Sequence, residues 1–403
     1  MNVYIYRNTA VAAIVFGAVG GQAQAAVTES SANYAIQARG FMHSPAFPDQ
    51  ERQDLSVSGE SQVSGDAAGW TWRWRPFLRL DSADEKRSHF DVREASVARP
   101  LGPGLIRAGI GRVFWGVSES QHLVDIVNQT DLIEDPDGED KLGQPMLSYA
   151  LGGDAGTLEV FVLPGFRPRT FPGKDGRLRF SLPIEFTHYE DPAEQWHVDG
   201  ALRYAGSFGP LELGLSWFSG TTRDPAYELA ASGTALTAVY EQIDQAGLDT
   251  QFLIGGLALK LEAIYRSGQR NRAFIEEDFG AATAGFEYSF SQLPGRPDSP
   301  MSLSAFLEYL YDSRGDQALT SFENDVFVGF RLDGNDANGT SIEAGVIQDA
   351  SESSRVISFE AERRFGAHLR TRLTARIFDL APNDFLADFD DDDYVEVEFG
   401  YFF

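Results

Sequence analysis

The chain has 403 residues, no Cys, 40 Gly and 30 Phe, and its formal net charge is −27. Without Cys it has no disulfide framework, no thiolate metal site and no thiol nucleophile. The acidic excess argues against nucleic-acid binding, which needs a basic surface. A mean hydropathy of −0.25 argues against a bundle of membrane helices. It is compatible with a membrane β-barrel, in which only alternate strand residues face lipid.

Residues 1–25 have the form of a secretory signal peptide. Arg7 gives a positive start, residues 9–19 are an apolar run, and Ala23 and Ala25 supply a small-x-small cleavage motif. The apolar run is too short to cross a bilayer as a helix. We therefore expect a cleaved leader at 1–25 and a single transmembrane domain at 26–403.

The mature chain consists of strand-length segments in which apolar and polar residues alternate. In residues 70–81 the Trp and Leu side chains share one face, whereas the Thr and Arg side chains share the other. The same alternation returns at 211–217, 257–266, 286–290, 302–312, 369–377 and 394–403. Apolar side chains toward lipid and polar ones toward a wet interior define the wall of a closed membrane barrel.

Short turns with Gly, Pro or Asp alternate along the chain with longer polar connections, as in an up-and-down barrel. The segments predict an all-β transmembrane antiparallel barrel of about 18 strands, with long extracellular loops, short periplasmic turns and both termini in the periplasm. If residues 34–43 and 55–64 are not both in the wall, the alternative is 16 strands, again an even number.

The last ten residues, 394–403, place apolar side chains at every second position up to the terminal Phe403. We expect this strand to close the barrel against the first one and to flank a column of arginines with Glu396 and Glu398. Its pattern resembles the C-terminal strand of Gram-negative outer-membrane barrels. That resemblance implies an outer-membrane location and recognition by the barrel-assembly machinery.

Two long loops, 116–144 and 164–196, are the candidates for a constriction or gate. Residues 118–121 have capping-box form and precede apolar residues at helical spacing, which predicts a short helix. One interpretation folds the first loop into the lumen, where Asp125, Asn128 and Asp131 would contact solute. The other leaves it at the surface with one amphipathic turn.

The first loop is acidic and the second is basic. Asp135, Asp137 and Asp140 could hold Ca²⁺ or Mg²⁺ through their oxygens, although a solvated acidic loop has the same composition. In the second loop Arg167 and Arg169 begin a run of five cations. These could pair with the acidic loop across the mouth, bind lipopolysaccharide phosphates, or favour anions in a narrow pore.

Two arginine columns share the polar faces of their strands, one early and one late. The early column has no evident acidic neighbour, so it is the stronger candidate for solute contact. The late column should lie between glutamates at 360–362 and 396–398, which favours a satisfied polar wall. The early column is Arg73, Arg75 and Arg79, and the late column is Arg370, Arg372 and Arg376.

Nothing in the sequence resembles a hydrolase motif. His188 and His197 lie near acidic residues, an arrangement that an ordinary polar loop also has. We therefore expect no enzyme activity and no cofactor beyond a divalent cation at the acidic loops.

Several runs are similar to a little-characterised group of porin-like proteobacterial outer-membrane proteins. The similar runs are 91–94, 111–116, 124–131, 163–166, 262–269 and 309–315. A weaker resemblance is to alginate-export-like barrels, which have similar Trp-Gly…Asp…Asn patterns. In those barrels Pro usually follows the Asn, whereas here Gln129 follows Asn128. The resemblance implies a barrel and its location rather than a substrate.

Our leading expectation is therefore an outer-membrane channel for small solutes, surrounded by lipopolysaccharide. An alternative is a barrel that exports or imports a lipid or polymer with a periplasmic transport partner. A third is an outer-membrane hydrolase.

Overall fold

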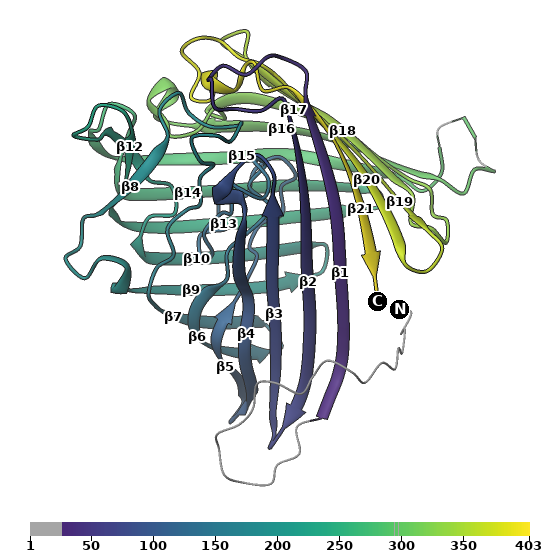
Figure 1. Cartoon of the computed structure of the whole chain (residues 1–403). Helices are drawn as coiled ribbons and strands as arrows, with labels where there is room; N and C mark the ends of the chain where they lie inside the picture. The colour runs from purple at the N-terminus through teal and green to yellow at the C-terminus, as the bar shows by residue number, and fades with distance from the viewer. Residues whose placement is uncertain (1–25, 294, 297) are drawn as a thin grey trace.

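The computed structural model describes residues 26–293, 295–296 and 298–403, so the predicted signal peptide lies outside the described residues. Eighteen strands form one antiparallel sheet that closes on itself, because β21 pairs with β1 (Figure 1). The wall strands are β1 (Ala26–Phe41), β2 (Gln53–Ala67), β3 (Trp70–Asp81), β4 (His89–Leu101), β5 (Gly104–Gly111), β6 (Gln144–Gly153), β7 (Gly156–Pro164), β9 (Val198–Phe208), β10 (Leu211–Thr221), β13 (Gln242–Ile254), β14 (Leu257–Arg270), β15 (Glu276–Phe290), β16 (Ser302–Asp312), β17 (Asn324–Asp333), β18 (Ser341–Asp349), β19 (Arg355–Phe365), β20 (Leu369–Asp379) and β21 (Tyr394–Phe402).

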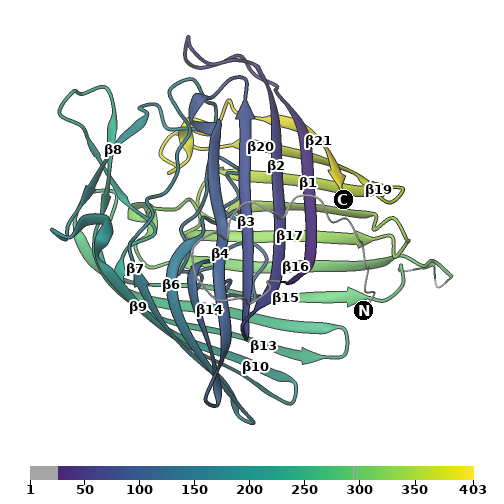
Figure 2. The same ribbon diagram turned by 60° about the horizontal axis from the view of Figure 1, so that its bottom comes forward.

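The closure of the barrel confirms the predicted place of the last strand. Its register with β1 runs from Asn33 opposite Phe402 to Phe41 opposite Tyr394. Both β1 and β2 belong to the wall, so the strand number is 18 and not the alternative 16. Each strand pairs with its neighbour in the chain, apart from the three short strands described below, and Figure 2 shows the strands following one another around the barrel.

The wall has an apolar exterior and a polar interior, as the alternation predicts. In β14 the side chains of Leu259 and Tyr265 are exposed on the outside, whereas Lys260, Glu262 and Arg266 are buried inside. Buried polar groups of this kind need partners, because an unpaired charge away from water is costly. Ion pairs and hydrogen bonds therefore organise much of the interior, beside several buried apolar clusters.

One irregularity in the wall has a local cause in the sequence. The register of β3 against β4 shifts between Arg75 and Pro76. Proline has no N–H to give to the ladder and is tolerated inside a sheet at a bulge. The extra residue lies in β4, because Arg75 is opposite Glu94 and Pro76 is opposite Val92, so the alternation of β3 itself is not interrupted.

The two ends of the barrel differ as expected. Tight turns join the strands at one end, for example at residues 68–69, 209–210 and 255–256, and long connections join them at the other. Two long connections carry a small separate sheet, which the sequence did not predict. It contains β8 (Ile184–Tyr189), β11 (Ala226–Leu229) and β12 (Leu236–Tyr240), with β8 parallel to β12 (Figure 1).

Helical structure in the described residues is limited to four single 3-10 turns. These are η1 (Glu85–Arg87), η2 (Glu194–Trp196), η3 (Gly315–Gln317) and η4 (Ala387–Phe389). In this part of the chain no helix is both long enough and apolar enough to cross a membrane.

Candidate functional site

The loop between β5 and β6 folds into the barrel instead of lying at its surface. Its apolar residues Trp115, Val124 and Val127 are buried in one cluster with wall residues such as Phe161 on β7 and Phe279 on β15. Burial of these side chains against the inward face of the wall favours the folded-in position by the hydrophobic effect. This is the lumen alternative of the two that the sequence left open.

The loop contains no helix, so the prediction of a short helix from residues 118–121 is wrong. The amides that would have begun it point to carboxylates of the wall. Glu262 on β14 accepts hydrogen bonds from the backbone of Val117 at 2.7 Å and Ser118 at 2.9 Å. Glu308 on β16 accepts those of Glu119 and Ser120, each at 2.9 Å. Hydrogen bonds to charged acceptors are stronger than the neutral bonds of a helical turn.

Gly116 permits this approach of the loop to the wall. Its φ is +136°, and a Cβ at this position would lie 2.7 Å from Glu262 Oε1. Any residue with a side chain would therefore be strained in its backbone and would also clash with the carboxylate.

Further ion pairs hold the tip of the loop on the side of the barrel away from β5. The Glu119 carboxylate lies 2.7 Å from Lys260 Nζ on β14 and 3.1 Å from Arg331 Nη2 on β17. In the strand order of the barrel, β17 stands about halfway around the ring from β5. The loop thus spans the lumen from its origin to the far wall.

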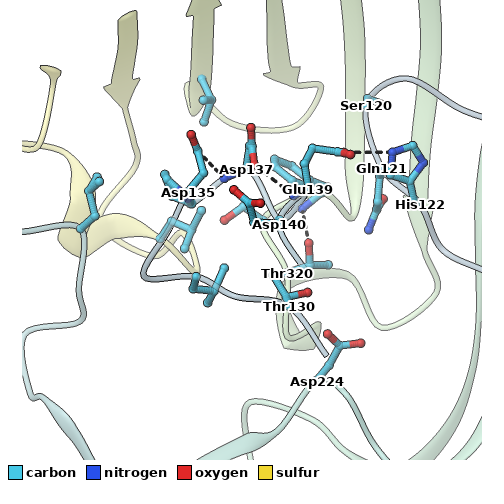
Figure 3. Close-up of a pocket in the computed structure, with 18 of the residues that line it drawn as sticks. Ser120, Gln121, His122, Thr130, Asp135, Asp137, Glu139, Asp140, Asp224 and Thr320 are labelled. Carbon is cyan, nitrogen blue, oxygen red and sulfur yellow. Dashed lines mark hydrogen bonds and ion pairs between the residues drawn. The ribbon is translucent and has the colours of Figure 1, made fainter. Parts of the chain in front are cut away.

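His122 links the outgoing half of the loop to the returning half. Its Nε2 lies 2.9 Å from Glu139 and its Nδ1 lies 3.9 Å from Glu262 (Figure 3). Burial alone would lower the pKa of His122, but the two carboxylates outweigh burial and raise this pKa to about 10. The imidazolium at neutral pH is therefore part of the loop's internal structure.

Of the three loop residues predicted to contact solute, Asn128 and Asp125 have clear structural partners. Asn128 donates to the carbonyls of Gly111 and Leu142 and accepts from the Val113 amide, which joins the two ends of the loop. Asp125 pairs with Lys141 at 3.4 Å and accepts from the Trp115 amide.

Asp131, the third, is buried and accepts a hydrogen bond of 2.7 Å from Thr170 of the next long loop. Burial raises its pKa. Asn128 and Asp125 line the lumen cavity described below, whereas Asp131 does not.

Each arginine of the early column has an acidic partner, although the sequence showed no evident acidic neighbour for this column. Arg73 pairs with Glu94 at 3.2 Å, and Arg75 with Glu60 at 2.5 Å. Arg79 is buried, and it pairs at 2.8 Å with Glu134 from the folded-in loop. The partners of this column come from neighbouring strands and from a distant loop. The premise that the column has no acidic neighbour, on which its preference as a solute contact was based, is therefore wrong.

The late column lies between the two glutamate pairs, as predicted. Arg372 pairs with Glu362 at 3.2 Å, and Arg370 lies between Glu362 at 3.5 Å and Glu398 at 3.8 Å. Arg376 pairs at 2.8 Å with Glu360, and it also reaches Asp137 of the folded-in loop at 3.1 Å. One column of the wall thus helps to hold the loop.

The basic loop, 164–196, pairs intramolecularly but not with the partner predicted. Arg167 binds Asp91 at 2.7 Å, Arg169 binds Asp224 at 2.6 Å, and Arg177 binds Asp392 at 2.5 Å. Among the described residues no ion pair joins this loop to residues 134–140. The two loops meet instead through hydrogen bonds in which one partner is neutral: Thr170 donates to the Asp131 carboxylate, and the Arg169 guanidinium donates to Gln129.

The loops and the wall enclose a cavity of ≈ 870 Å³ inside the barrel. This lies within the range of about 300–1,000 Å³ typical of ligand-sized pockets. Several carboxylates of the folded-in loop gather on one side of the cavity, and Asp224 stands apart from them (Figure 3). Of the predicted solute contacts, Arg79, Asp125, Asn128, Arg169, Arg372 and Arg376 line it, whereas Arg73, Arg75, Asp131, Arg167 and Arg370 do not.

The outer end of this cavity is aromatic. Phe180 packs against Tyr227 at 5.2 Å and against Phe385 at 5.5 Å between ring centroids. Phe171 and Phe389 extend the group at 6.0 and 6.3 Å from its members. These rings come from three different long connections, so sequence spacing alone could not assemble them.

The carboxylates proposed for a divalent cation have other partners. The backbone amides of Asp137 and Glu139 donate to Asp135 and Asp137, and Asp140 lies 3.9 Å from Arg93. Burial, together with the charge of Asp135, raises the pKa of Asp137 well above its usual value. Cation binding at Asp135, Asp137 and Asp140 stays a prediction.

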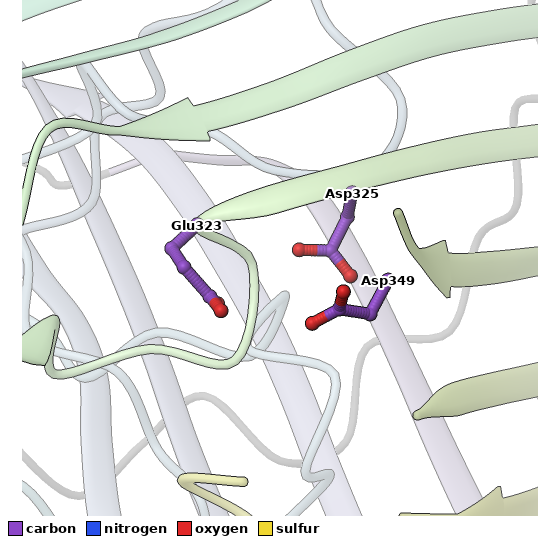
Figure 4. Close-up of side chains that lie close together, drawn as sticks. All are labelled: Glu323, Asp325 and Asp349. Carbon is purple, nitrogen blue, oxygen red and sulfur yellow. The ribbon is translucent and has the colours of Figure 1, made fainter. Parts of the chain in front are cut away.

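Within the described residues one acidic group has ligand atoms close enough together to hold a metal. Glu323, Asp325 and Asp349 place one ligand atom each within 4.8 Å of one another at the long-loop ends of β17 and β18 (Figure 4). Burial and neighbouring acids raise the pKa of Glu323 to about 7. Glu323 and Asp325 are two residues apart in the sequence, whereas Asp349 lies on the next strand, opposite Asp325.

The polar barrel lumen crossed by a long inward loop is the architecture of a porin-like β-barrel. The sequence matches no protein-family model and no curated protein. Solved structures share the fold. Wzi of Escherichia coli, an outer-membrane protein involved in group 1 capsule assembly and a carbohydrate-binding β-barrel, matches with a TM-score of 0.51 at 10% identity over 91% of this chain and 83% of that one.

A second solved structure, OccD3 (OpdP) of Pseudomonas aeruginosa, matches with a TM-score of 0.51 at 11% identity over 95% of this chain and 93% of that one. At such identities the likeness concerns the fold. The resemblance to the proteobacterial group and to alginate-export-like barrels stays a prediction.

Proposed function

We propose that this protein is an outer-membrane channel of a Gram-negative bacterium that lets small hydrophilic solutes cross. The loop at 116–144 is its constriction, and the loop at 164–196 forms part of the roof. The observation that carries this proposal is the attachment of the first loop to the far wall through Glu262 and Glu308. A loop that only capped the barrel would not need acceptors deep in the wall.

The orientation follows from the same proposal. The short turns and both termini face the periplasm, and the long loops face outside, where lipopolysaccharide surrounds the rim. The barrel-assembly machinery would insert the chain, and a divalent cation could bridge acidic loops and lipopolysaccharide.

Conductance of the purified protein in a planar lipid bilayer tests the proposal. Steady single-channel steps are expected, because water and ions fill a polar lumen. A correctly folded barrel that stays silent in repeated reconstitutions would contradict it.

A second candidate is a barrel that binds or passes a polymer such as a polysaccharide with a periplasmic partner. The aromatic group around Phe180 and Tyr227 favours it, because aromatic faces pack against apolar faces of extended ligands. The carbohydrate-binding barrel Wzi shares the fold. Binding of oligosaccharides, measured by tryptophan fluorescence and lost in Phe180→Ala and Tyr227→Ala, would support this candidate. Unchanged conductance in saturating oligosaccharide would argue against it.

A further inference from the structure

The charges that line the lumen cavity are not balanced. Thirteen aspartates and glutamates line it, against ten arginines and lysines and the imidazolium of His122. A narrow cavity with low-dielectric walls focuses the field of such an excess and raises the local concentration of counter-ions.

The acidic side chains are also the more accessible ones. The side chain of Glu139, which pairs with His122 at 2.9 Å, is 57% exposed, and that of Glu343, which pairs with Arg331 at 2.8 Å, is 46% exposed. The most exposed cations of the cavity with a carboxylate partner are Arg372, at 40%, and Arg331, at 34%. A solute in the lumen therefore meets carboxylate oxygens more often than guanidinium groups.

Most cations of the cavity are already saturated by protein acceptors. Arg223 donates to Asp199 and to the carbonyls of Val127 and Thr221. Arg266 donates to Gln245, Asp224 and Gln269. Arg79, Arg169, Arg314 and Arg376 likewise pair with carboxylates. Recruiting one of these cations for an anion would break a buried network, which is costly.

By contrast, the Asp140 carboxylate has no hydrogen bond within the described part of the chain, and its nearest cation, Arg93, is 3.9 Å away. Ser118 adds a neutral oxygen on the loop. Ser118 is one of the residues that line the cavity, it is only 5% exposed, and its buried hydroxyl has no hydrogen-bond partner among the described residues. An oxygen set of this kind suits a partly dehydrated cation.

The outer mouth has the same sign. The connection between β20 and β21 contains Asp384, Asp388 and the run 390–393, and several of these carboxylates are exposed. A cation approaching from this end meets attraction before it reaches the cavity, whereas an anion meets repulsion.

We propose that the lumen selects for cations, with the exposed carboxylates of Glu139 and Asp140 as its selectivity-determining groups. This inference rests on the proposed channel function and names the solute class as small inorganic or organic cations. It is opposite to the anion preference that was one of three interpretations of the basic loop.

The test is the reversal potential of the full-length protein in a planar bilayer under a KCl gradient. K⁺ and Cl⁻ have nearly equal mobilities in water, so an unselective pore gives a reversal potential near zero. The wild type should show a K⁺/Cl⁻ permeability ratio above one. In the double variant Glu139→Gln, Asp140→Asn this ratio should fall roughly twofold or more.

Two matched variants complete the design. Asp154→Asn removes the same charge from an exposed tight turn between β6 and β7, and should leave the ratio unchanged. Arg372→Gln removes the most exposed paired cation and should raise the ratio. Heat-modifiable migration on a gel shows whether each variant folds. If a variant does not fold, the permeability ratio of the wild type alone still tests cation selectivity.

The outcomes separate the two proposals. Steps with a reversal potential at zero or on the anion side, in the wild type, overturn cation selectivity and leave the channel intact. A folded protein without any channel steps overturns the channel, and the selectivity with it. A ratio that falls equally in Asp154→Asn overturns the role of Glu139 and Asp140.

Discussion

The backbone amide of Ser118 donates a hydrogen bond of 2.9 Å to Glu262 Oε1, across the lumen from the strand where the loop begins. This contact joins the first part of the loop to the middle of a wall strand. Residues 118–121 have helix-start features in the sequence, but the loop forms no helix here.

Gly116→Ala should enlarge the pore. The new Cβ would meet Glu262 Oε1 at 2.7 Å with φ at +136°, so the loop must move from the wall. We expect a higher single-channel conductance in a barrel that still folds. Gly209→Ala is the control, because it strains a positive φ of +63° in a tight turn that has open space around the Cβ. Equal conductance in Gly116→Ala and the wild type would show that the loop does not limit flow.

The conductance should depend on pH through His122. The pKa of His122 in the folded protein is raised from 6.5 to about 10. The stabilisation from its ion pairs is therefore fully present below pH 6.5 and is lost as the pH rises through about 10. Between pH 6.5 and about 10 the loop stays closed, and above a pH of about 10 the conductance should increase.

His122→Gln should remove this alkaline transition and give the open conductance at neutral pH. His368→Gln, in the turn between β19 and β20, should keep the transition of the wild type. An alkaline transition of the same size in His122→Gln would assign it to another group.

Arg79→Gln should destabilise the protein strongly. It leaves the buried Glu134 carboxylate without its closest partner, at 2.8 Å. Breaking one side of a buried ion pair costs about 3–5 kcal/mol. Urea unfolding followed by tryptophan fluorescence measures the loss, and Arg79→Gln with Glu134→Gln should lose less than the sum of the single variants. Arg355→Gln breaks an ion pair with Asp379 that is half exposed on both sides, and should cost about 1 kcal/mol or less.

The barrel was predictable because the same alternation of apolar and polar residues repeats along the chain. Each wall strand carries the same period-two alternation, so an error in one segment does not change the result. The position of the late arginine column followed from the same pattern, because strands adjacent in the chain pair with each other. The pair of β1 and β21 followed from closure, because the last strand of a closed barrel must pair with the first.

The contents of the lumen were not predictable in the same way. The pairing of Arg79 with Glu134 joins residues 55 positions apart, and that of Lys260 with Glu119 joins residues 141 positions apart. Local spacing cannot report such contacts. The polar face of β14 did place Lys260 and Glu262 toward the lumen, but only the structure shows that they receive a loop.

In the proposed channel, the loop attached to Glu262 and Glu308 limits passage through the lumen. The most direct measurement compares single-channel conductance of the wild type with that of Glu262→Ala, Glu308→Ala, using Glu159→Gln as a control. In the described residues Glu159 has no hydrogen bond or ion pair to the loop. Larger single-channel conductance steps are expected in the double variant alone. Equal steps in all three folded proteins would contradict it.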